Sequence, residues 1–131
     1  MKRFTVRRLA ALLAAATLFT PFTSMAADSP PAFRHVVIFG FKEGTPSAKL
    51  DEITTAFKAL KEKIPSIKGF EWGSNVSPEN MNPELTHVFT LTFESKEALE
   101  KTYLHHPEHM KFVELVKPHI AKAVVVDYAA K

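Results

Sequence analysis

The chain of 131 residues contains no cysteine, and it lacks an apolar run long enough to cross a membrane. Its longest such run, residues 9–19, is about half the length of the roughly 20 residues that a spanning helix needs. Without disulfides, the fold must depend on its hydrophobic core or on an oligomer. Internal repeats are also absent, and the length suffices for one domain but not comfortably for two. These absences indicate a single small domain.

The first 26 residues have the parts of a secretory signal peptide in the usual order. Basic residues, including Arg7-Arg8, precede the apolar run, and small residues follow it at Ser24 and Ala26, the two positions that a signal peptidase reads. We therefore expect cleavage after Ala26 and export, to the periplasm of a bacterium or as a secreted protein. The arginine pair leaves twin-arginine export open, although general secretion is the default. A run this short predicts no stable membrane insertion.

Cleavage at this position would change the charge of the protein. The whole chain has 17 basic and 14 acidic residues, whereas residues 27–131 keep 13 basic residues and all of the acidic ones, a net charge of −1. Binding to nucleic acid needs a basic face, so no nucleic-acid partner is expected. Within this part, residues 27–33 are expected to form an extended tail and residues 34–131 the folded domain.

Two periodicities predict the order β-α-β-β-α-β in the domain. Alternating apolar residues indicate strands at residues 34–42, 69–76, 86–94 and 121–128. Helical spacing indicates a first helix that Thr45 caps and Pro65 ends. A second helical region is capped by Ser95 and interrupted by Pro107. This is the order of a ferredoxin-like α+β fold with an antiparallel sheet and helices on one face.

The other face of this sheet is predicted to be apolar as well. It carries Val36 and Ile38 of the first strand, and Val124 and Val126 of the last. Because no helix covers that face in this fold, an apolar surface there needs a partner. We therefore expect a homodimer in which two copies join sheet to sheet around a two-fold axis and close a dimeric α+β barrel.

Five segments of the chain resemble, in order, those of the stress-responsive dimeric A/B barrel (Dabb) family. They are Arg34-His35-Val36-Val37 with Phe41-Lys42, Phe70-Glu71-Trp72-Gly73-Ser74-Asn75-Val76-Ser77-Pro78, Thr86-His87-Val88 with Thr92-Phe93, Tyr103-Leu104-His105-His106-Pro107-Glu108-His109, and Asp127-Tyr128. Together they span almost the whole domain. The resemblance implies the dimeric barrel but no single function, because the family includes plant stress proteins, bacterial proteins of unassigned role and a cofactor-free plant polyketide cyclase.

The resemblance also implies a site. In the cyclase, a tyrosine and the last histidine of the motif perform an aldol condensation, and the matching residues here are Tyr103 and His109. Histidines that line its cavity match His35 and His87. A neutral imidazole can accept a proton from carbon, and a phenol can donate a hydrogen bond to the enolate oxygen, so no cofactor is expected. The residues expected to bind the substrate are His35, Val37, Phe39, Trp72, His87 and Phe89.

The histidines around Pro107 also suggest a metal site, since imidazole and carboxylate are good ligands for zinc. The residues concerned are His105, His106, Glu108 and His109. A pair of ligands at positions i and i+4 needs an unbroken helix, and Pro107 lies between His105 and His109. No metal is therefore expected.

The sequence leaves three functions open. The first is the binding of a small hydrophobic or carbonyl-bearing molecule between sheet and helices. The second is cofactor-free, aldol-type cyclase or lyase chemistry by His109 and Tyr103. The third is a purely structural dimer or larger assembly, in which Tyr103 only packs, His109 caps a helix, and His35, His87 and Trp72 belong to the core. The polar groups that are predicted to face the pocket favour the first two.

Overall fold

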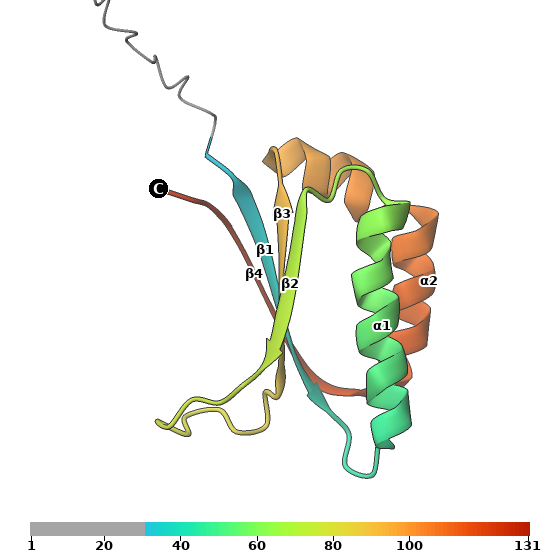
Figure 1. The fold of residues 1–131 in the computed structure, drawn as a ribbon, viewed down its shortest axis with the longest axis vertical. Helices are drawn as coiled ribbons and strands as arrows, with labels where there is room; N and C mark the ends of the chain where they lie inside the picture. Colours follow the sequence, from blue (N-terminus) through green and yellow to red (C-terminus); the bar gives the residue numbers. More distant parts are fainter. Residues whose placement is uncertain (1–30) are drawn as a thin grey trace, which may run out of the picture.

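The computed structural model describes residues 31–131, so the predicted signal peptide lies outside the described residues. In the described part, a four-stranded sheet carries two helices on one face (Figure 1). The elements are β1 (Phe33–Phe41), α1 (Ser47–Lys63), β2 (Gly69–Ser74), β3 (His87–Phe93), the π-helical η1 (Ala98–Tyr103), α2 (Pro107–Val116), the short 3-10 helix η2 (Lys117–His119) and β4 (Ile120–Ala129). Sheet order is β2-β3-β1-β4 with antiparallel neighbours throughout, which confirms the predicted ferredoxin-like α+β fold. Among residues 31–131, no helix is both long and apolar enough to span a membrane.

The turn between β1 and α1 differs in one respect from the prediction. Gly44 has a φ of 80°, a left-handed conformation that favours glycine, and lies in the predicted turn. Thr45 was predicted to cap α1, but this was wrong, because its hydroxyl donates instead to the Lys42 carbonyl oxygen (2.7 Å). That bond closes the turn, and the extended Pro46 takes the N-cap position without a side-chain cap. The helix therefore begins at Ser47.

Phenylalanine rings form the core between the sheet and the helices. Phe57 of α1 lies at its centre, with its ring centroid 4.3 Å from that of Phe112 in α2 and 4.6 Å from that of Phe89 in β3. Phe39 of β1 and Phe70 of β2 contact the same ring. Buried aromatic rings contribute large apolar areas, and their tilted and stacked contacts add to the stabilisation. This core holds both helices against one face of the sheet.

The helix-free face of the sheet is apolar, as predicted. Across the β1–β4 pair, Val36 lies opposite Val126 and Ile38 lies opposite Val124, so the four side chains share one face. Val126 is 49% exposed in the single chain. β4 has β1 as its neighbour and forms one edge of the described sheet. A contiguous apolar surface of this kind is typical of a face that is covered in an assembly.

Replacement of Gly40 by Ala should destabilise the fold by about 1–3 kcal/mol, the usual cost of overpacking. Gly40 is buried near the end of β1, where an added Cβ would overlap the Glu84 carbonyl oxygen. That oxygen belongs to the backbone and cannot rotate away. Urea unfolding measures the difference in free energy. The matched control is Gly73→Ala, because nothing lies within 4 Å of a Cβ built at Gly73; equal destabilisation by both changes would contradict the prediction.

Candidate functional site

Three predicted site residues come together, each from a different element. His35 lies on β1, Tyr103 ends η1, and His109 lies in the first turn of α2. The ring centroid of Tyr103 is 4.3 Å from that of His109 and 5.6 Å from that of His35. Tyr103 is fully buried, His35 is nearly so, and His109 is partly exposed. We refer to these three residues as the Tyr103 cluster.

Local structure on both sides of Pro107 brings Tyr103 and His109 together. The Ser95 hydroxyl oxygen accepts a hydrogen bond from the Ala98 amide (3.1 Å), which confirms the predicted cap. The chain then forms η1, whose wide π-helical turn ends at Tyr103. Pro107 begins α2, where its missing N–H would have no partner within the helix in any case. The break between the two helical segments allows the rings of two residues that are six positions apart to contact each other at a tilt of 39°.

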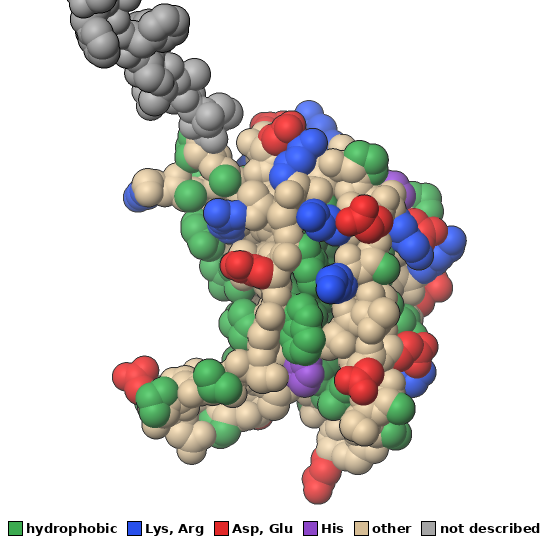
Figure 2. Space-filling view, in the orientation of Figure 1, with side chains coloured by type: hydrophobic (Ala, Val, Ile, Leu, Met, Phe, Trp, Pro, Cys, Tyr) green, Lys and Arg blue, Asp and Glu red, His purple; other side chains and the backbone are tan. Residues whose placement is uncertain are grey.

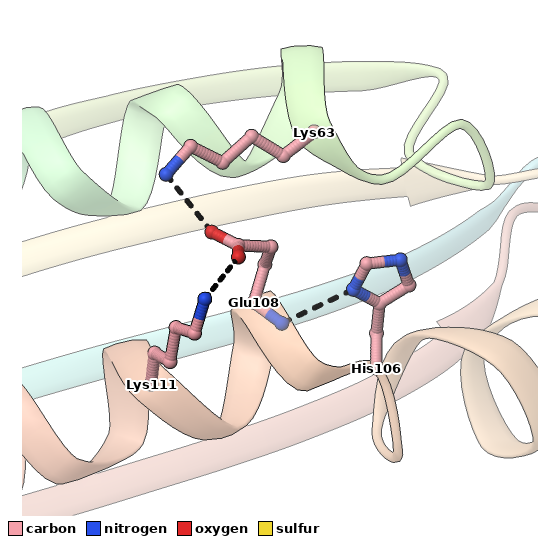
Figure 3. Close-up of polar contacts among 4 residues, drawn as sticks. All are labelled: Lys63, His106, Glu108 and Lys111. Carbon is pink, nitrogen blue, oxygen red and sulfur yellow. Dashed lines mark hydrogen bonds and ion pairs between the residues drawn. The ribbon is translucent and has the colours of Figure 1, made fainter.

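His106 and Glu108, which were considered above as metal ligands, instead stabilise the start of α2 (Figure 3). The His106 Nδ1 accepts a hydrogen bond from the Glu108 amide (3.2 Å), so His106, and not His109, caps this helix. The Glu108 carboxylate accepts hydrogen bonds from Lys111 (2.7 Å) and from Lys63 of α1 (2.9 Å), which lower its pKa to about 2. Within residues 31–131, no three His, Asp or Glu side chains form a group that could hold a metal ion.

Hydrogen bonding fixes the tautomer of His109. Its Nδ1 lies 3.2 Å from the Leu104 carbonyl oxygen, which can only accept, so Nδ1 carries the hydrogen and Nε2 is left as an acceptor. Burial lowers the pKa of His109, and its neighbours His35 and His106 act in the same direction, against the opposing effect of the Leu104 hydrogen bond. The imidazole is therefore neutral at neutral pH and can accept a proton on Nε2.

The hydroxyl of Tyr103 is buried and has no hydrogen-bond partner among the described residues. Burial raises the pKa of this phenol, so the group keeps its proton and acts as a donor. An unpartnered buried hydroxyl costs about 1–3 kcal/mol of stability, and each case needs an explanation. A donor in such surroundings is suited to a carbonyl oxygen, or to the negative charge that develops on it during a reaction.

Asp127 connects the Tyr103 cluster with the surface. Sequence analysis did not include it in the site and noted it only in the last segment that resembles the family. It lies opposite His35 in the β1–β4 pair, and its carboxylate accepts a hydrogen bond from the His35 Nδ1 at 2.6 Å. The Asp127 side chain is 39% exposed. One feature of the sequence could have pointed to Asp127 as a site residue, because it is a charged residue directly after three valines of the last strand. The pairing register was needed to connect this residue with His35.

His87, the fourth polar residue of the predicted site, lies elsewhere. It pairs with Phe39 across the β1–β3 ladder, whereas His35 pairs with Leu91, which places the two histidines about 13 Å apart along the strands. His87 stacks on Trp72, with an interplanar angle of 3°, and Trp72 is 45% exposed instead of belonging to the core.

The apolar residues of the predicted site lie in the core between these two groups. They are Val37, Phe39 and Phe89, which are at most 7% exposed. The structure therefore divides the predicted binding residues into two locations. The Tyr103 cluster with Asp127 is one of them, and the pair of Trp72 and His87 is the other.

Comparison with known proteins identifies the family. The family model described as "Stress responsive A/B Barrel Domain" matches residues 33–130. The stress-response A/B barrel domain-containing protein HS1 of Arabidopsis thaliana is 38% identical over 95 residues, which cover 72% of this chain and 86% of HS1. Olivetolic acid cyclase of Cannabis sativa is 29% identical over 100 residues, which cover 76% of this chain and 98% of the cyclase.

Solved structures agree with this assignment. The hydroxynitrile lyase of Passiflora edulis has a TM-score of 0.72 at 25% identity, over 78% of this chain and 95% of the lyase. A dimeric ferredoxin-like protein of unknown function from Thermobifida fusca has a TM-score of 0.66 at 20% identity, over 77% of this chain and 92% of that protein. The family model covers nearly all of the described residues, and the same fold recurs in these structures. The chain therefore belongs to the stress-responsive A/B barrel domain (Dabb) family.

Proposed function

We propose that the Tyr103 cluster binds a small hydrophobic molecule through its carbonyl group. The observation that carries this proposal is the buried Tyr103 hydroxyl, which has no partner among the described residues. A carbonyl oxygen of a ligand would accept the hydrogen bond that the protein leaves unmade. Because Tyr103 is fully buried, such a ligand approaches it from the side of His109 and Asp127, which are partly exposed.

The composition of the site supports a ligand that is mostly apolar. The ring of Phe93 packs on Tyr103 at a centroid distance of 5.2 Å, and the polar groups are limited to a few oriented side chains. Small-molecule sites typically combine an apolar lining with a small number of such groups. Two similar proteins are named as a cyclase and as a hydroxynitrile lyase, which is consistent with a fold that accommodates small organic molecules.

We also propose that the protein acts as an exported homodimer. The signal-peptide pattern of the first 26 residues supports export. The apolar helix-free face around Val36 and Ile38 supports pairing through the sheets, and similar structures are described as dimeric. Intact-mass measurement of protein recovered outside the cytoplasm tests the first part. A chain that begins at Ala27 is expected, and one that keeps residues 9–19 would contradict it.

Replacement of Tyr103 by Phe should remove most of the ligand retention and raise the free energy of unfolding by about 1–3 kcal/mol, the cost of the unpartnered hydroxyl. The change removes only a hydroxyl that makes no hydrogen bond within the described residues. Native mass spectrometry of protein purified from its own host detects a retained molecule, and urea unfolding measures stability. The matched control is Tyr128→Phe, because Tyr128 is 47% exposed on β4. Equal retention by both variants would contradict the proposal and leave the structural assembly as the better interpretation.

A second function, proton abstraction next to the carbonyl group, is favoured by the tautomer of His109. Its Nε2 is a neutral acceptor, and the Tyr103 ring lies directly beside the imidazole. The base would take a proton from the α-carbon while the phenol stabilises the enolate oxygen, which is the first step of an aldol-type closure or a lyase reaction. This chemistry needs no cofactor.

A further inference from the structure

A groove runs between the edge strand β2 and helix α1, on the side of the molecule that Figure 2 presents. It has a volume of about 360 Å³, within the usual range of small-molecule sites. Its lining residues are Thr55, Lys58, Ala59, Lys61, Glu62 and Phe70. Figure 2 shows hydrophobic side chains along the hollow between the two elements, ending at a histidine.

Trp72 lies beside the groove, next to its lining residue Phe70. Phe70 and Trp72 are two positions apart on β2 and therefore point to the same face of the sheet. Trp72 is 45% exposed, and its ring stacks on His87 at a centroid distance of 6.0 Å and on Phe89 at 5.9 Å. His87 in turn stacks on the buried Phe89. A large exposed ring that neighbouring aromatic rings hold in place offers a stacking surface for another planar ring.

The wall of the groove that belongs to α1 carries positive charge. Lys58 and Lys61 form no ion pair within residues 31–131, whereas Lys63 of the same helix is paired with Glu108. One carboxylate, Glu62, lies on this wall, so the lining keeps a net charge of one positive unit. α1 and β2 run in opposite directions (Figure 1), and Lys58 and Lys61 of α1 line the groove together with Phe70 of β2.

We propose that this groove is a second binding site, separate from the Tyr103 cluster, and that it takes a planar aromatic carboxylate. The ring of the ligand stacks on Trp72 and lies over Phe70, and its carboxylate is held by Lys58 and Lys61. The net charge of the lining favours a ligand with one negative charge. This site does not depend on the function of the Tyr103 cluster, because it shares no residue with that cluster.

The chain offers a direct test, because Trp72 is its only tryptophan. Titration with benzoate, followed by tryptophan fluorescence, therefore reports on this groove, and benzamide serves as the uncharged ligand of the same shape. We expect a saturable change in fluorescence with benzoate and weaker binding of benzamide. The K58Q/K61Q double variant should weaken benzoate binding about fivefold, as expected for exposed ion pairs, and leave benzamide binding unchanged. The matched control is Lys101→Gln, a change at an exposed lysine of η1.

Three results would overturn the proposal. The first is an absence of saturable fluorescence change with benzoate. The second is equal affinity for benzoate in the unchanged protein, the double variant and the Lys101→Gln control. The third is loss of the fluorescence response in Tyr103→Phe, which would place the ligand in the Tyr103 cluster. Conversely, a benzoate response that survives in Tyr103→Phe supports the groove, even if the function proposed for the Tyr103 cluster fails.

Discussion

Replacement of His109 by Ala should slow the exchange of α-protons in a small aromatic ketone by about 10²–10⁴-fold, the usual contribution of a positioned general base. Acetophenone in D₂O is a suitable probe, because loss of its methyl proton signal in NMR spectra measures proton abstraction without knowledge of the natural substrate. In the proposed function, the neutral Nε2 of His109 would take the proton while Tyr103 would donate to the ketone oxygen. The alanine variant keeps the phenol but has no base.

The dependence of this exchange on pH follows from the environment of His109. Burial lowers the pKa of His109 from its ordinary value of 6.5, so the unprotonated base persists at a lower pH than in a free histidine. The midpoint of the decline in rate should therefore lie at a pH below 6.5, the value expected for a free histidine. His119→Ala is the matched control, because His119 lies on η2 outside the cluster. The same rate in the His109→Ala and His119→Ala variants would show that His109 is not the base.

Replacement of Ile38 by Asp should prevent formation of the proposed dimer. Ile38 lies opposite Val124 and Val88 on the helix-free face, so the new carboxylate would be buried without a partner when two sheets meet. Burial of an unpaired charge costs several kcal/mol, which is a large part of the stability of a small domain. Light scattering after size exclusion gives the mass, and circular dichroism shows whether the remaining chains are folded.

A variant with the same charge at another place provides the control for this experiment. Ser74 is exposed at the end of β2, where Ser74→Asp adds a carboxylate without burial. This variant should keep the mass and the unfolding midpoint of the unchanged protein. A native dimer formed by Ile38→Asp would show that the helix-free face is not the interface between copies.

Alternation and helical spacing were sufficient to predict the fold, because each element has one clearly apolar side. The strand predicted at residues 34–42 appears as Phe33–Phe41, and the helix that Pro65 was expected to end stops at Lys63. Errors arose where local hydrogen bonds compete. The Thr45 hydroxyl can cap a helix or close a turn, and the sequence pattern does not show that the Lys42 carbonyl oxygen is the preferred partner.

The candidate site was only partly predictable for a different reason. Tyr103 and His109 were connected by family resemblance, since the spacing across a π-helical segment and Pro107 does not determine a contact. The separation of His35 from His87 depends on the register between β1 and β3, and the contact of His35 with Asp127 depends on that between β1 and β4. Registers follow from the packing of whole elements, and a single strand does not reveal them.

The position of β4 at the edge of the sheet has a consequence for handling the protein. It is a strand of ten residues, and its three consecutive valines are all at least partly exposed in the single chain. Long edge strands with apolar side chains readily pair with strands of other molecules and aggregate. A separated protomer would therefore tend to precipitate. If the proposed dimer forms, variants that weaken association should therefore reduce the yield of soluble protein.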